Sequence, residues 1–496
     1  MLPTKVVYVV VDGMSTAAFE QVTACGRAPA FSFLKDRAHY VRDAVAIFPT
    51  ITPAATSSLI TGATPAEHRV PGMCWYDRDV PRFVNYGQSP RAAVVEGMSQ
   101  IVEDVLVNLN EHHLSRNVAT LHESLDELGF VSASINYMIF RGPYEHELKP
   151  NMLEKLLFRK QLPKRLRGPK EHYFADVCSG DSEACSGVLN TRGLDKRIKA
   201  TDAYAACVTR ELLERDAADM ILFYMHENDH HSHETGPHGQ IDSLAEADEN
   251  LQHVFDGFDS WEQAIEEVGW VVTADHSQSP VMDDDDHVFA LEDVCEEFEK
   301  VDPSRGEEPM DGRDMAIAGN GRLGFVYLSP DRKSLLDSSV VACLEEADGI
   351  DQVMYQDGVD YVVHSDRGRV HFRDANEDDG VVDERGHWWS YEGDLGAVGG
   401  VVEESEIRTS EYPLAFWRIK NALDLDRTGD IVITTKLGYE VKDLAGGDHR
   451  GGGDHGSLHA QDSLIPFLST LDPPPRHPVT SDLAPHILDH FKRLQS

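Results

Sequence analysis

Residues 226–239, HENDHHSHETGPHG, concentrate side chains that bind metal ions. The segment holds five histidines, one aspartate and two glutamates. Imidazole nitrogens and carboxylate oxygens suit hard-to-borderline divalent cations. Asp229 and His233 are four residues apart, and Gly236-Pro237 turns the chain away after them. This spacing predicts that Asp229 and His233 bind a metal together. The other four histidines are predicted to lie beside the site or on the surface, with His226 lining a pocket: His226, His230, His231 and His238.

Three further segments carry the same kinds of side chain. Asp12 follows the apolar run VVYVVV, Asp275 and His276 end the stretch WVVTADH, and His455 lies in GGGDHG. Each pair alone is weak evidence, because an acidic protein produces Asp-His neighbours by chance. Together and in this order they predict a metal site assembled from distant parts of the chain, since His455 lies more than two hundred residues after the opening segment.

Thr52, in FPTITPAATSSLITG (48–62), is a candidate nucleophile. Pro is favoured at the first helical position, so Pro53 predicts Thr52 as the N-cap of a helix. A helix start offers free N–H groups and a positive dipole end, which suit a phosphate and a hydroxyl that becomes an oxyanion. This segment alone leaves two interpretations open, a helix cap only or a catalytic hydroxyl.

Short apolar runs alternating with helical patterns must position these side chains. Such alternation predicts an α/β fold, a mostly parallel sheet sandwiched by helices, in which ligands bind beyond the carboxyl ends of the strands. Asp12, Asp229, Asp275 and His276 all fall there. The expected strands are residues 6–11, 132–140, 219–225, 270–276 and 429–436. The expected helices between them are residues 117–129, 201–215 and about 260–268.

Residues 283–428 break this alternation. They open with DDDDHV, which is typical of a solvated loop, and continue with short strands and a helix at about 334–346. We expect a core in two parts, residues 1–282 and 429–496, separated by a smaller α+β insertion at 283–428. GDIVITTK (429–436) is expected to return the chain to the core sheet.

The ordered motifs resemble those of the alkaline phosphatase superfamily, in particular its nucleotide pyrophosphatase/type I phosphodiesterase branch. The resemblance covers residues 5–77, 219–280 and 429–470. The family pattern is a strand-end Asp, a Thr or Ser nucleophile about forty residues later, a TG closing its helix, DxxxHxxGP, a DH pair and an HG in a glycine-rich loop. The matching residues are Asp12, Thr52, Thr61-Gly62, Asp229 to Pro237, Asp275-His276 and His455-Gly456.

The resemblance implies two divalent metal ions. Asp229, His233 and His455 would hold one ion; the other would be held by the remaining family ligands, Asp12, Asp275, His276 and the Thr52 oxygen. Two such ions clamp the attacking and leaving oxygens of an in-line displacement. The implied reaction is hydrolysis of a small-molecule phosphate ester or nucleotide through a phospho-threonine intermediate. Zinc suits these ligands best, and Mn²⁺ also fits.

Two departures from the family pattern leave the substrate open. Pro53 stands where relatives often have an aromatic residue, and Met73 where they have an Asn that donates to a phosphoryl oxygen. Tyr224 matches a position where relatives stack a base or sugar, although a core tyrosine is an equal interpretation.

A phosphodiesterase or nucleotide pyrophosphatase is expected. The alternatives are a phosphomonoesterase or phosphonoacetate-type hydrolase, and a non-catalytic metal-binding relative. A sulfatase is disfavoured, because Cys/Ser-x-Pro-x-Arg is absent around Thr52.

The composition is strongly acidic. The chain has 496 residues, with 86 acidic against 45 basic residues and a net charge of −41, and Lys supplies only 15 of the 45. This charge repels nucleic acid and anionic membranes. Diffuse acidity with scarce Lys is typical of proteins from salt-loving organisms, because salt screens the self-repulsion. The alternative is an ordinary acidic cytosolic protein.

Seven cysteines without a CxxC pair argue against a disulfide framework or a structural zinc module. Cys178 and Cys185 share a loop and could pair, but free thiols are expected.

The first apolar run is too short for a signal peptide or a membrane span, and no later run is long enough. We therefore expect a soluble, cytoplasmic protein in a cell interior of high salt.

Overall fold

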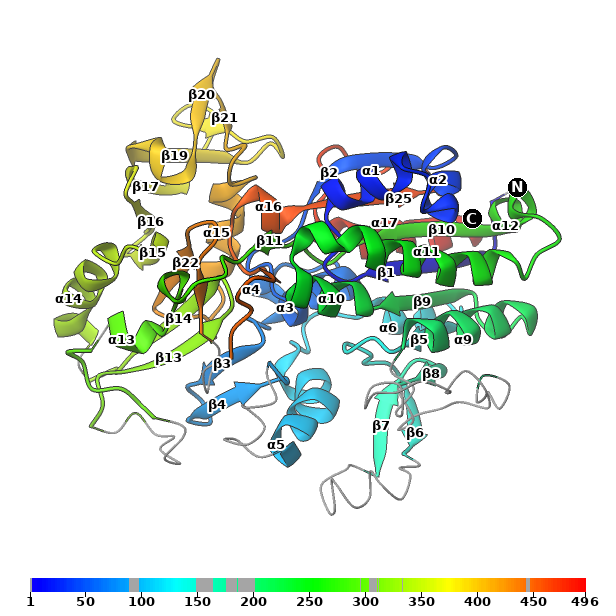
Figure 1. The fold of residues 1–496 in the computed structure, drawn as a ribbon, viewed down its shortest axis with the longest axis horizontal. Coiled ribbons are helices and arrows are strands. Elements are labelled where there is room, and N and C mark those ends of the chain that lie inside the picture. Colours follow the sequence, from blue (N-terminus) through cyan, green and yellow to red (C-terminus); the bar gives the residue numbers. More distant parts are fainter. Residues whose placement is uncertain are drawn as a thin grey trace.

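The fold is known from a computed structural model (Figure 1). The structure describes residues 2–88, 98–148, 164–174, 185, 201–294, 296–302, 310, 312–331, 333–442 and 447–496. None of the described helices combines the length and the apolar character needed to cross a membrane.

The core is a seven-stranded sheet with the order β2-β25-β10-β1-β9-β5-β8. Its central strands are parallel, and only β25 runs antiparallel to its neighbours β10 and β2. The central strands are almost wholly buried because both faces of the sheet are covered, which explains their continuous apolar runs. The predicted mostly parallel α/β sheet is confirmed. The strands are β1 (Lys5–Val11), β2 (His39–Val45), β5 (Ser132–Ile135), β8 (Glu171–Tyr173), β9 (Met220–Met225), β10 (Val268–Thr273) and β25 (Leu464–Ser469).

Two groups of helices sandwich this sheet (Figure 1). The long helix α11 contacts α1, α2, α9 and α10 in one group, and α17 contacts α3 and α6 in the other. The first group is α1 (Thr16–Ala24), α2 (Pro29–Lys35), α9 (Asp202–Glu214), α10 (Glu227–Thr235) and α11 (Gln240–Phe255). The second group is α3 (Thr52–Thr61), α6 (Leu121–Glu127) and α17 (Leu483–Leu494).

A second, ten-stranded sheet lies beside the core and is coloured from green to orange in Figure 1. Its order is β13-β14-β22-β15-β16-β17-β19-β18-β21-β20, and it packs with α14 (Lys333–Glu345) and α15 (Ala415–Leu423). Its strands are β13 (Met315–Asn320), β14 (Leu323–Leu328), β15 (Ile350–Asp357), β16 (Asp360–Ser365), β17 (Gly368–Asp374), β18 (Val381–Val382), β19 (Trp388–Gly393), β20 (Val401–Glu403), β21 (Glu406–Arg408) and β22 (Ile431–Thr435).

The strand β22 corrects one expectation. We expected GDIVITTK to return the chain to the core sheet, but Ile431–Thr435 pairs antiparallel with β14 and β15 in the second sheet. Apolar β-branched residues fit the centre of either sheet, so composition could not distinguish them. After β24 (Gly453–Asp454), which pairs with β11 (Ser279–Pro280) in a separate two-stranded sheet, the chain rejoins the core sheet at β25.

Two local expectations were also wrong. Thr52 is the first residue of α3 rather than its N-cap, which is Ile51, and Pro53 follows in the first turn. Cys185 is not a free thiol, because it forms a disulfide with Cys207 in α9. Cys178, the partner considered from the sequence, lies outside the described residues.

Candidate metal centre

The site lies at the carboxyl ends of three neighbouring parallel strands, β10, β1 and β9. Val10 pairs with Thr273 and Val11 with Met225, so these strands end side by side. Asp12 follows β1, while Asp275 and His276 follow β10. Asp229 and His233 lie one turn apart on α10, directly after β9. The parallel topology therefore brings together residues from three distant segments.

One group of donor atoms surrounds His276. Its Nε2 atom lies 3.5 Å from Asp12 Oδ1 and 3.5 Å from Asp275 Oδ2. Thr52 Oγ1 lies 3.1 Å from the same nitrogen. Asp12, Asp275, His276 and Thr52 are all buried, and the first three form a group that could hold a metal ion.

A second group surrounds Asp229. Asp229 Oδ2 lies 3.2 Å from His233 Nε2, and Asp229 Oδ1 lies 3.9 Å from His455 Nε2. Asp454 also belongs to this second group, because its carboxylate lies close enough to His233 and His455 to hold an ion together with them. Sequence reasoning did not single out Asp454, although it forms an Asp-His pair with His455 just as Asp275 does with His276.

The orientation of the histidines fits metal binding. Nδ1 of His233 lies 2.8 Å from the Gly453 carbonyl oxygen, and Nδ1 of His455 lies 2.7 Å from that of Thr50. Nδ1 of His276 faces the Ser277 carbonyl oxygen at 3.2 Å. A carbonyl only accepts, so each Nδ1 carries the proton and each Nε2 keeps a lone pair for a metal.

The spacing of the donors also fits metal ions. Bonds of ~2.0–2.2 Å to a tetrahedral zinc place neighbouring donors about 3.4 Å apart. The donor pairs described in the two groups are 3.1 to 3.9 Å apart. Asp12 Oδ1, Asp275 Oδ2 and Asp454 Oδ2 are buried and have no hydrogen-bond partner among the described residues, although buried polar atoms normally have one. The donor chemistry thus fits divalent cations.

The electrostatics favour a cation at the same place. Burial and the nearby Asp275 and Asp229 carboxylates raise the pKa of Asp12 well above its ordinary value. Burial and Asp229 raise the pKa of Asp275 to about 6. Burial, together with His276, lowers the pKa of His455 to about 4, so its ring is neutral near pH 7. Crowded carboxylates beside the neutral His455 imidazole are stabilised by an added positive charge.

Buried amides hold the Asp12 segment in place. Asn228 donates to the Asp12 carbonyl oxygen at 2.7 Å, and Gln240 donates to the Gly13 carbonyl oxygen at 2.8 Å. Gly13 has φ +66°, and a Cβ there would lie 2.7 Å from Asp229 Oδ1. Glycine is required because the backbone is left-handed and must pass close to a candidate ligand.

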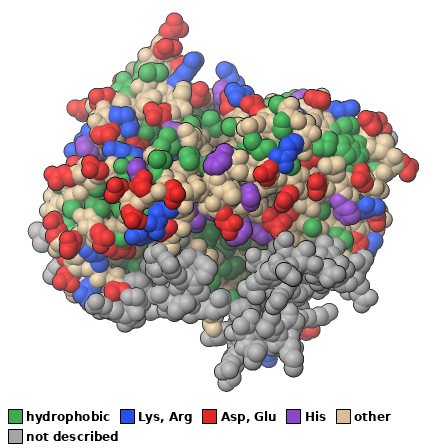
Figure 2. All heavy atoms as spheres, viewed as in Figure 1, with side chains coloured by type: hydrophobic (Ala, Val, Ile, Leu, Met, Phe, Trp, Pro, Cys, Tyr) green, Lys and Arg blue, Asp and Glu red, His purple; other side chains and the backbone are tan. Residues whose placement is uncertain are grey.

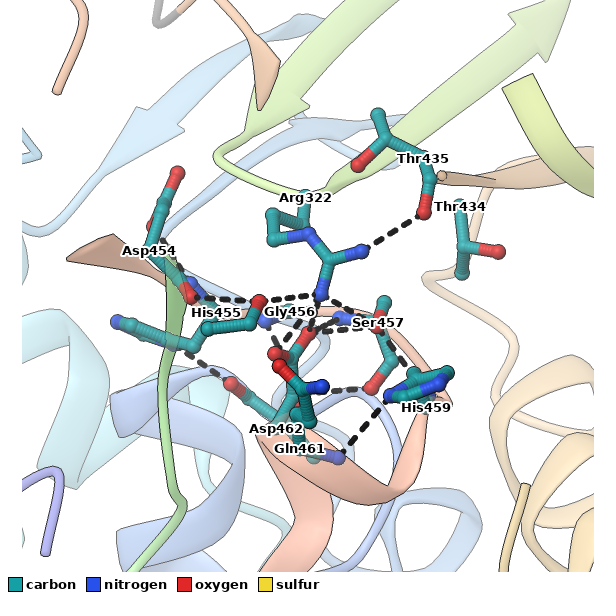
Figure 3. Close-up of polar contacts among 12 residues, drawn as sticks. Arg322, Thr434, Thr435, Asp454, His455, Gly456, Ser457, His459, Gln461 and Asp462 are labelled. Atoms are coloured by element: carbon teal, nitrogen blue, oxygen red, sulfur yellow. Dashed lines mark hydrogen bonds and ion pairs between the residues drawn. The ribbon is translucent and has the colours of Figure 1, made fainter. Parts of the chain in front are cut away.

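The His455 loop is anchored by a fully buried ion pair (Figure 3). Arg322 Nη1 lies 2.7 Å from Asp462 Oδ2, and the Arg322 N–H donates to the His455 carbonyl oxygen. Asp462 Oδ2 accepts from the Ser457 N–H, while the Asp462 carbonyl oxygen accepts from the Ser277 N–H. One carboxylate residue therefore braces the loops that carry both His455 and His276.

The site opens into a cavity of about 880 Å³ whose wall includes Thr52, Asp229, His233 and His455. In Figure 2, histidine side chains gather near the middle of the visible face, with acidic side chains around them. A cavity of this size accommodates a nucleotide-sized ligand.

Three other predicted residues are placed as follows. Met73 lines the cavity. Tyr224 does not; it is buried, packs edge-on against Tyr137 and donates its hydroxyl to Asp12, which favours the core interpretation. His226 lies beside Asp202 instead of on the cavity wall, where His230 is found.

Two wall residues were not foreseen. Asn320, the last residue of β13, accepts from the Met73 and Cys74 N–H groups and donates to the Cys74 carbonyl oxygen. Its amide braces the Met73 segment. His449 also lines the cavity, and its ring centroid lies 4.3 Å from that of His233. The glycine-rich sequence DHRGGGDHG, with a histidine before His455, was the available signal.

The chain is similar to known proteins over nearly its whole length. The family model described as type I phosphodiesterase/nucleotide pyrophosphatase matches residues 6–458. No curated protein matches the chain. Murine ectonucleotide pyrophosphatase/phosphodiesterase 5 is 12% identical with a TM-score of 0.56, covering 98% of this chain and 95% of that one. An inactive variant of that protein has been solved in complex with AMP.

Phosphonoacetate hydrolase from Sinorhizobium meliloti 1021 is a second structural neighbour. It is 16% identical with a TM-score of 0.56, and the match covers 99% of this chain and 96% of that one. Its structures hold phosphonoformate or phosphonoacetate. At these identities the structural likeness shows a common fold.

Proposed function

The chain belongs to the type I phosphodiesterase/nucleotide pyrophosphatase family, and on this premise we propose that it hydrolyses small phosphate esters or nucleotides through a phosphorylated Thr52. The proposed substrate class is a phosphodiester or a nucleotide pyrophosphate. The observation that carries the proposal is the convergence of Thr52 Oγ1 with two groups of metal-binding donors at one end of the sheet.

The proposed ligands divide between two ions. Asp229, His233 and His455 would hold one divalent cation. The second would be held by Asp12, Asp275, His276 and the Thr52 oxygen. When bound, such cations supply Lewis-acid charge that lowers the pKa of a hydroxyl and neutralises charge developing on phosphoryl oxygens. Zn²⁺ suits the mixed imidazole and carboxylate ligands best, and Mn²⁺ is the alternative.

In the proposed reaction, Thr52 Oγ1 gives its proton to solvent and forms a bond to phosphorus. The bond from phosphorus to the leaving oxygen breaks, and that oxygen departs with the electron pair and is protonated by solvent. Water then attacks the phospho-threonine and restores the Thr52 hydroxyl. The position of Thr52 in the first turn of α3 supports this role, because the free N–H groups and the positive dipole end of a helix start would stabilise a negatively charged group bound there. The hydroxyl is not needed as a cap, since Ile51 occupies the N-cap position.

A second candidate is a phosphomonoesterase or a phosphonoacetate-type hydrolase using the same residues. The observation that favours it is Met73, whose thioether on the cavity wall offers no hydrogen-bond donor to a phosphoryl oxygen. A phosphonoacetate hydrolase among the structural neighbours is consistent with it.

Rates on bis-p-nitrophenyl phosphate and p-nitrophenyl phosphate distinguish these candidates. Both are measured with Zn²⁺ and with Mn²⁺, because metal identity is part of the proposal. A higher kcat/KM on the diester is expected. A clear preference for the monoester would contradict the diesterase proposal, and inactivity of the metal-loaded protein on all phosphate esters and phosphonates would contradict the hydrolase proposal itself.

A further inference from the structure

The aspartates of the two donor groups share one arrangement, in which a protein donor holds one carboxylate oxygen and leaves the other open. Asp275 Oδ1 accepts from the Gly13 and His276 N–H groups at 3.2 and 3.0 Å. Asp454 Oδ1 accepts from the His455 N–H at 2.8 Å. The Oδ2 atoms of both aspartates are buried and have no hydrogen-bond partner among the described residues. Backbone N–H groups thus decide which oxygen of these two aspartates remains for a cation.

Side chains perform the same task for the other two aspartates. The Tyr224 hydroxyl donates to Asp12 Oδ2, and Asp12 Oδ1 has no hydrogen-bond partner within the described part of the chain. The Gln278 amide donates to Asp229 Oδ1, and Asp229 Oδ2 remains beside His233 Nε2 at 3.2 Å. The two donors therefore contact different metal groups, one donor for each group.

Tyr224 is fixed by the core around it. It is 6% exposed in β9 and pairs with Val10 of β1, two residues before Asp12. Its ring packs edge-on against Tyr137, with the centroids 5.2 Å apart. Asn228 holds the Asp12 backbone at the same time, because its amide donates to the Asp12 carbonyl oxygen at 2.7 Å. The donor and its acceptor are therefore both held in position, since a packed core leaves side chains little rotational freedom.

Gln278 is fixed in a similar way. It is 3% exposed, directly before β11, and its amide nitrogen also lies 3.4 Å from the Asp229 carbonyl oxygen. Only the amide nitrogen can face these two acceptors, because the amide oxygen has no proton to donate. Gly453 confines the other side of the amide, where a Cβ would lie 2.7 Å from Gln278 Oε1. The Gln278 side chain thus holds both the backbone and the carboxylate of Asp229.

We infer that Tyr224 and Gln278 are positioning residues: Tyr224 orients Asp12 for one metal ion, and Gln278 orients Asp229 for the other. The inference rests on the proposed function, to which these two ligands belong, and it gives the buried Tyr224 a role other than contact with substrate. A phenol and an amide donate hydrogen bonds while uncharged, so neither contact requires a titrating group. Partners of this kind fix the orientation of a metal ligand and thereby raise metal affinity.

Zn²⁺ binding to variants that keep the shape of each side chain tests this role. Tyr224→Phe keeps the ring and removes only the hydroxyl, and Gln278→Met keeps the length of the side chain and removes the amide. Each substitution is made in two backgrounds: His455→Asn, which should retain the ion of the Asp12 group, and Asp275→Asn, which should retain the ion of the Asp229 group. Dissociation constants are measured by competition with a chromogenic chelator.

The two substitutions should act on different ions, because each donor contacts one ligand only. In His455→Asn, Tyr224→Phe is expected to weaken Zn²⁺ binding by about 10- to 100-fold, whereas Gln278→Met should leave it unchanged. In Asp275→Asn the effects should exchange, so that Gln278→Met weakens Zn²⁺ binding and Tyr224→Phe does not.

Two matched controls remove a buried or half-buried donor that contacts no proposed metal ligand. Tyr137→Phe removes the hydroxyl that donates to the Thr56 carbonyl oxygen at 2.8 Å. Gln252→Met removes the amide that donates to Asp248 Oδ2 at 2.9 Å, a carboxylate outside both metal groups. Both controls should leave the dissociation constant of Zn²⁺ unchanged in both backgrounds.

Equal weakening of the two ions by either substitution would overturn the inference, because a residue with a purely structural role would disturb both groups together. Unchanged Zn²⁺ binding in Tyr224→Phe and Gln278→Met would also overturn it. Failure of the proposed function is distinguishable, since it would appear in the unsubstituted protein as an absence of hydrolysis of every phosphate compound while both ions are bound.

Discussion

The hydroxyl oxygen of Thr52 lies 3.1 Å from Nε2 of His276, although 224 positions separate these residues in the chain. Helix α3 delivers the hydroxyl, and the loop after β10 delivers the imidazole. The contact connects the proposed nucleophile directly to a proposed metal ligand.

Removing the Thr52 hydroxyl should abolish catalysis. We expect Thr52→Ala to lower kcat by about 10³-fold or more, because no covalent intermediate can form. Thr52→Ser, which keeps the hydroxyl, should retain activity. Acid quenching with a labelled substrate should trap phosphate on the wild-type protein and not on Thr52→Ala. Thr61→Ala, at the other end of α3, is the control, and wild-type rates for Thr52→Ala would exclude Thr52 as the nucleophile.

His455→Asn should reduce metal binding. The side chain presents Nε2 to Asp229, so its loss removes one ligand from that group. We expect the metal content after dialysis to fall from two ions per chain towards one, as measured by mass spectrometry. His459→Asn is the control, because His459 belongs to neither group and Asn also caps a helix. Two retained ions in His455→Asn would contradict the assignment.

Asp462→Asn should destabilise the protein and disturb the metal site. It leaves Arg322 buried with an incomplete partner, and breaking a buried pair costs about 3–5 kcal/mol of unfolding free energy. Denaturant unfolding measures this loss. Asp242→Asn breaks the exposed pair with Arg27 and should change the stability little, because solvent screens this pair. If the free energy of unfolding falls equally little in both variants, the Arg322–Asp462 pair does not anchor the loops.

Acid should destabilise the fold through His122. This histidine is buried beside Ser132, and burial lowers its pKa from 6.5 to about 3. The unfolded chain therefore binds the proton first, so the contribution is present above pH 6.5 and is lost as pH falls towards 3. Between pH 6.5 and about 4.5 the loss is about 2–3 kcal/mol. The stability of His122→Asn should fall less than that of the wild type over this range. A constant difference between the two proteins would refute the assignment.

Salt should stabilise the protein. With a net charge of −41, self-repulsion acts over a Debye length of about 10 Å at 0.1 M salt and about 3 Å at 1 M. We expect the thermal midpoint and the activity to rise together between 0.1 and 2 M KCl. Full stability and activity below about 1 M would favour the ordinary acidic cytosolic alternative instead.

The sequence alone predicted the parallel core and most candidate ligands. Continuous apolar runs such as VVYVVV are local signals of a strand buried on both faces, and a parallel strand places whatever follows it at one edge of the sheet. Asp12, Asp275 and His276 could therefore be assigned to the same edge without coordinates.

Tertiary structure alone decided the remaining features. GDIVITTK reads as a buried strand, but pairing with β14 and β15 assigned it to the second sheet. Tyr224 could have faced a ligand or the core, and its contacts with Tyr137 and Asp12 put it in the core. Glu440 and His449 carry no spacing that predicts their hydrogen bond, because the strand Glu440–Val441 and the glycine-rich loop meet only in the folded chain. Periodicity and motif order depend on residues that are close together or ordered along the sequence, so they can be recognised without a structure. The partner of a side chain depends on packing between segments that are remote from each other in the chain.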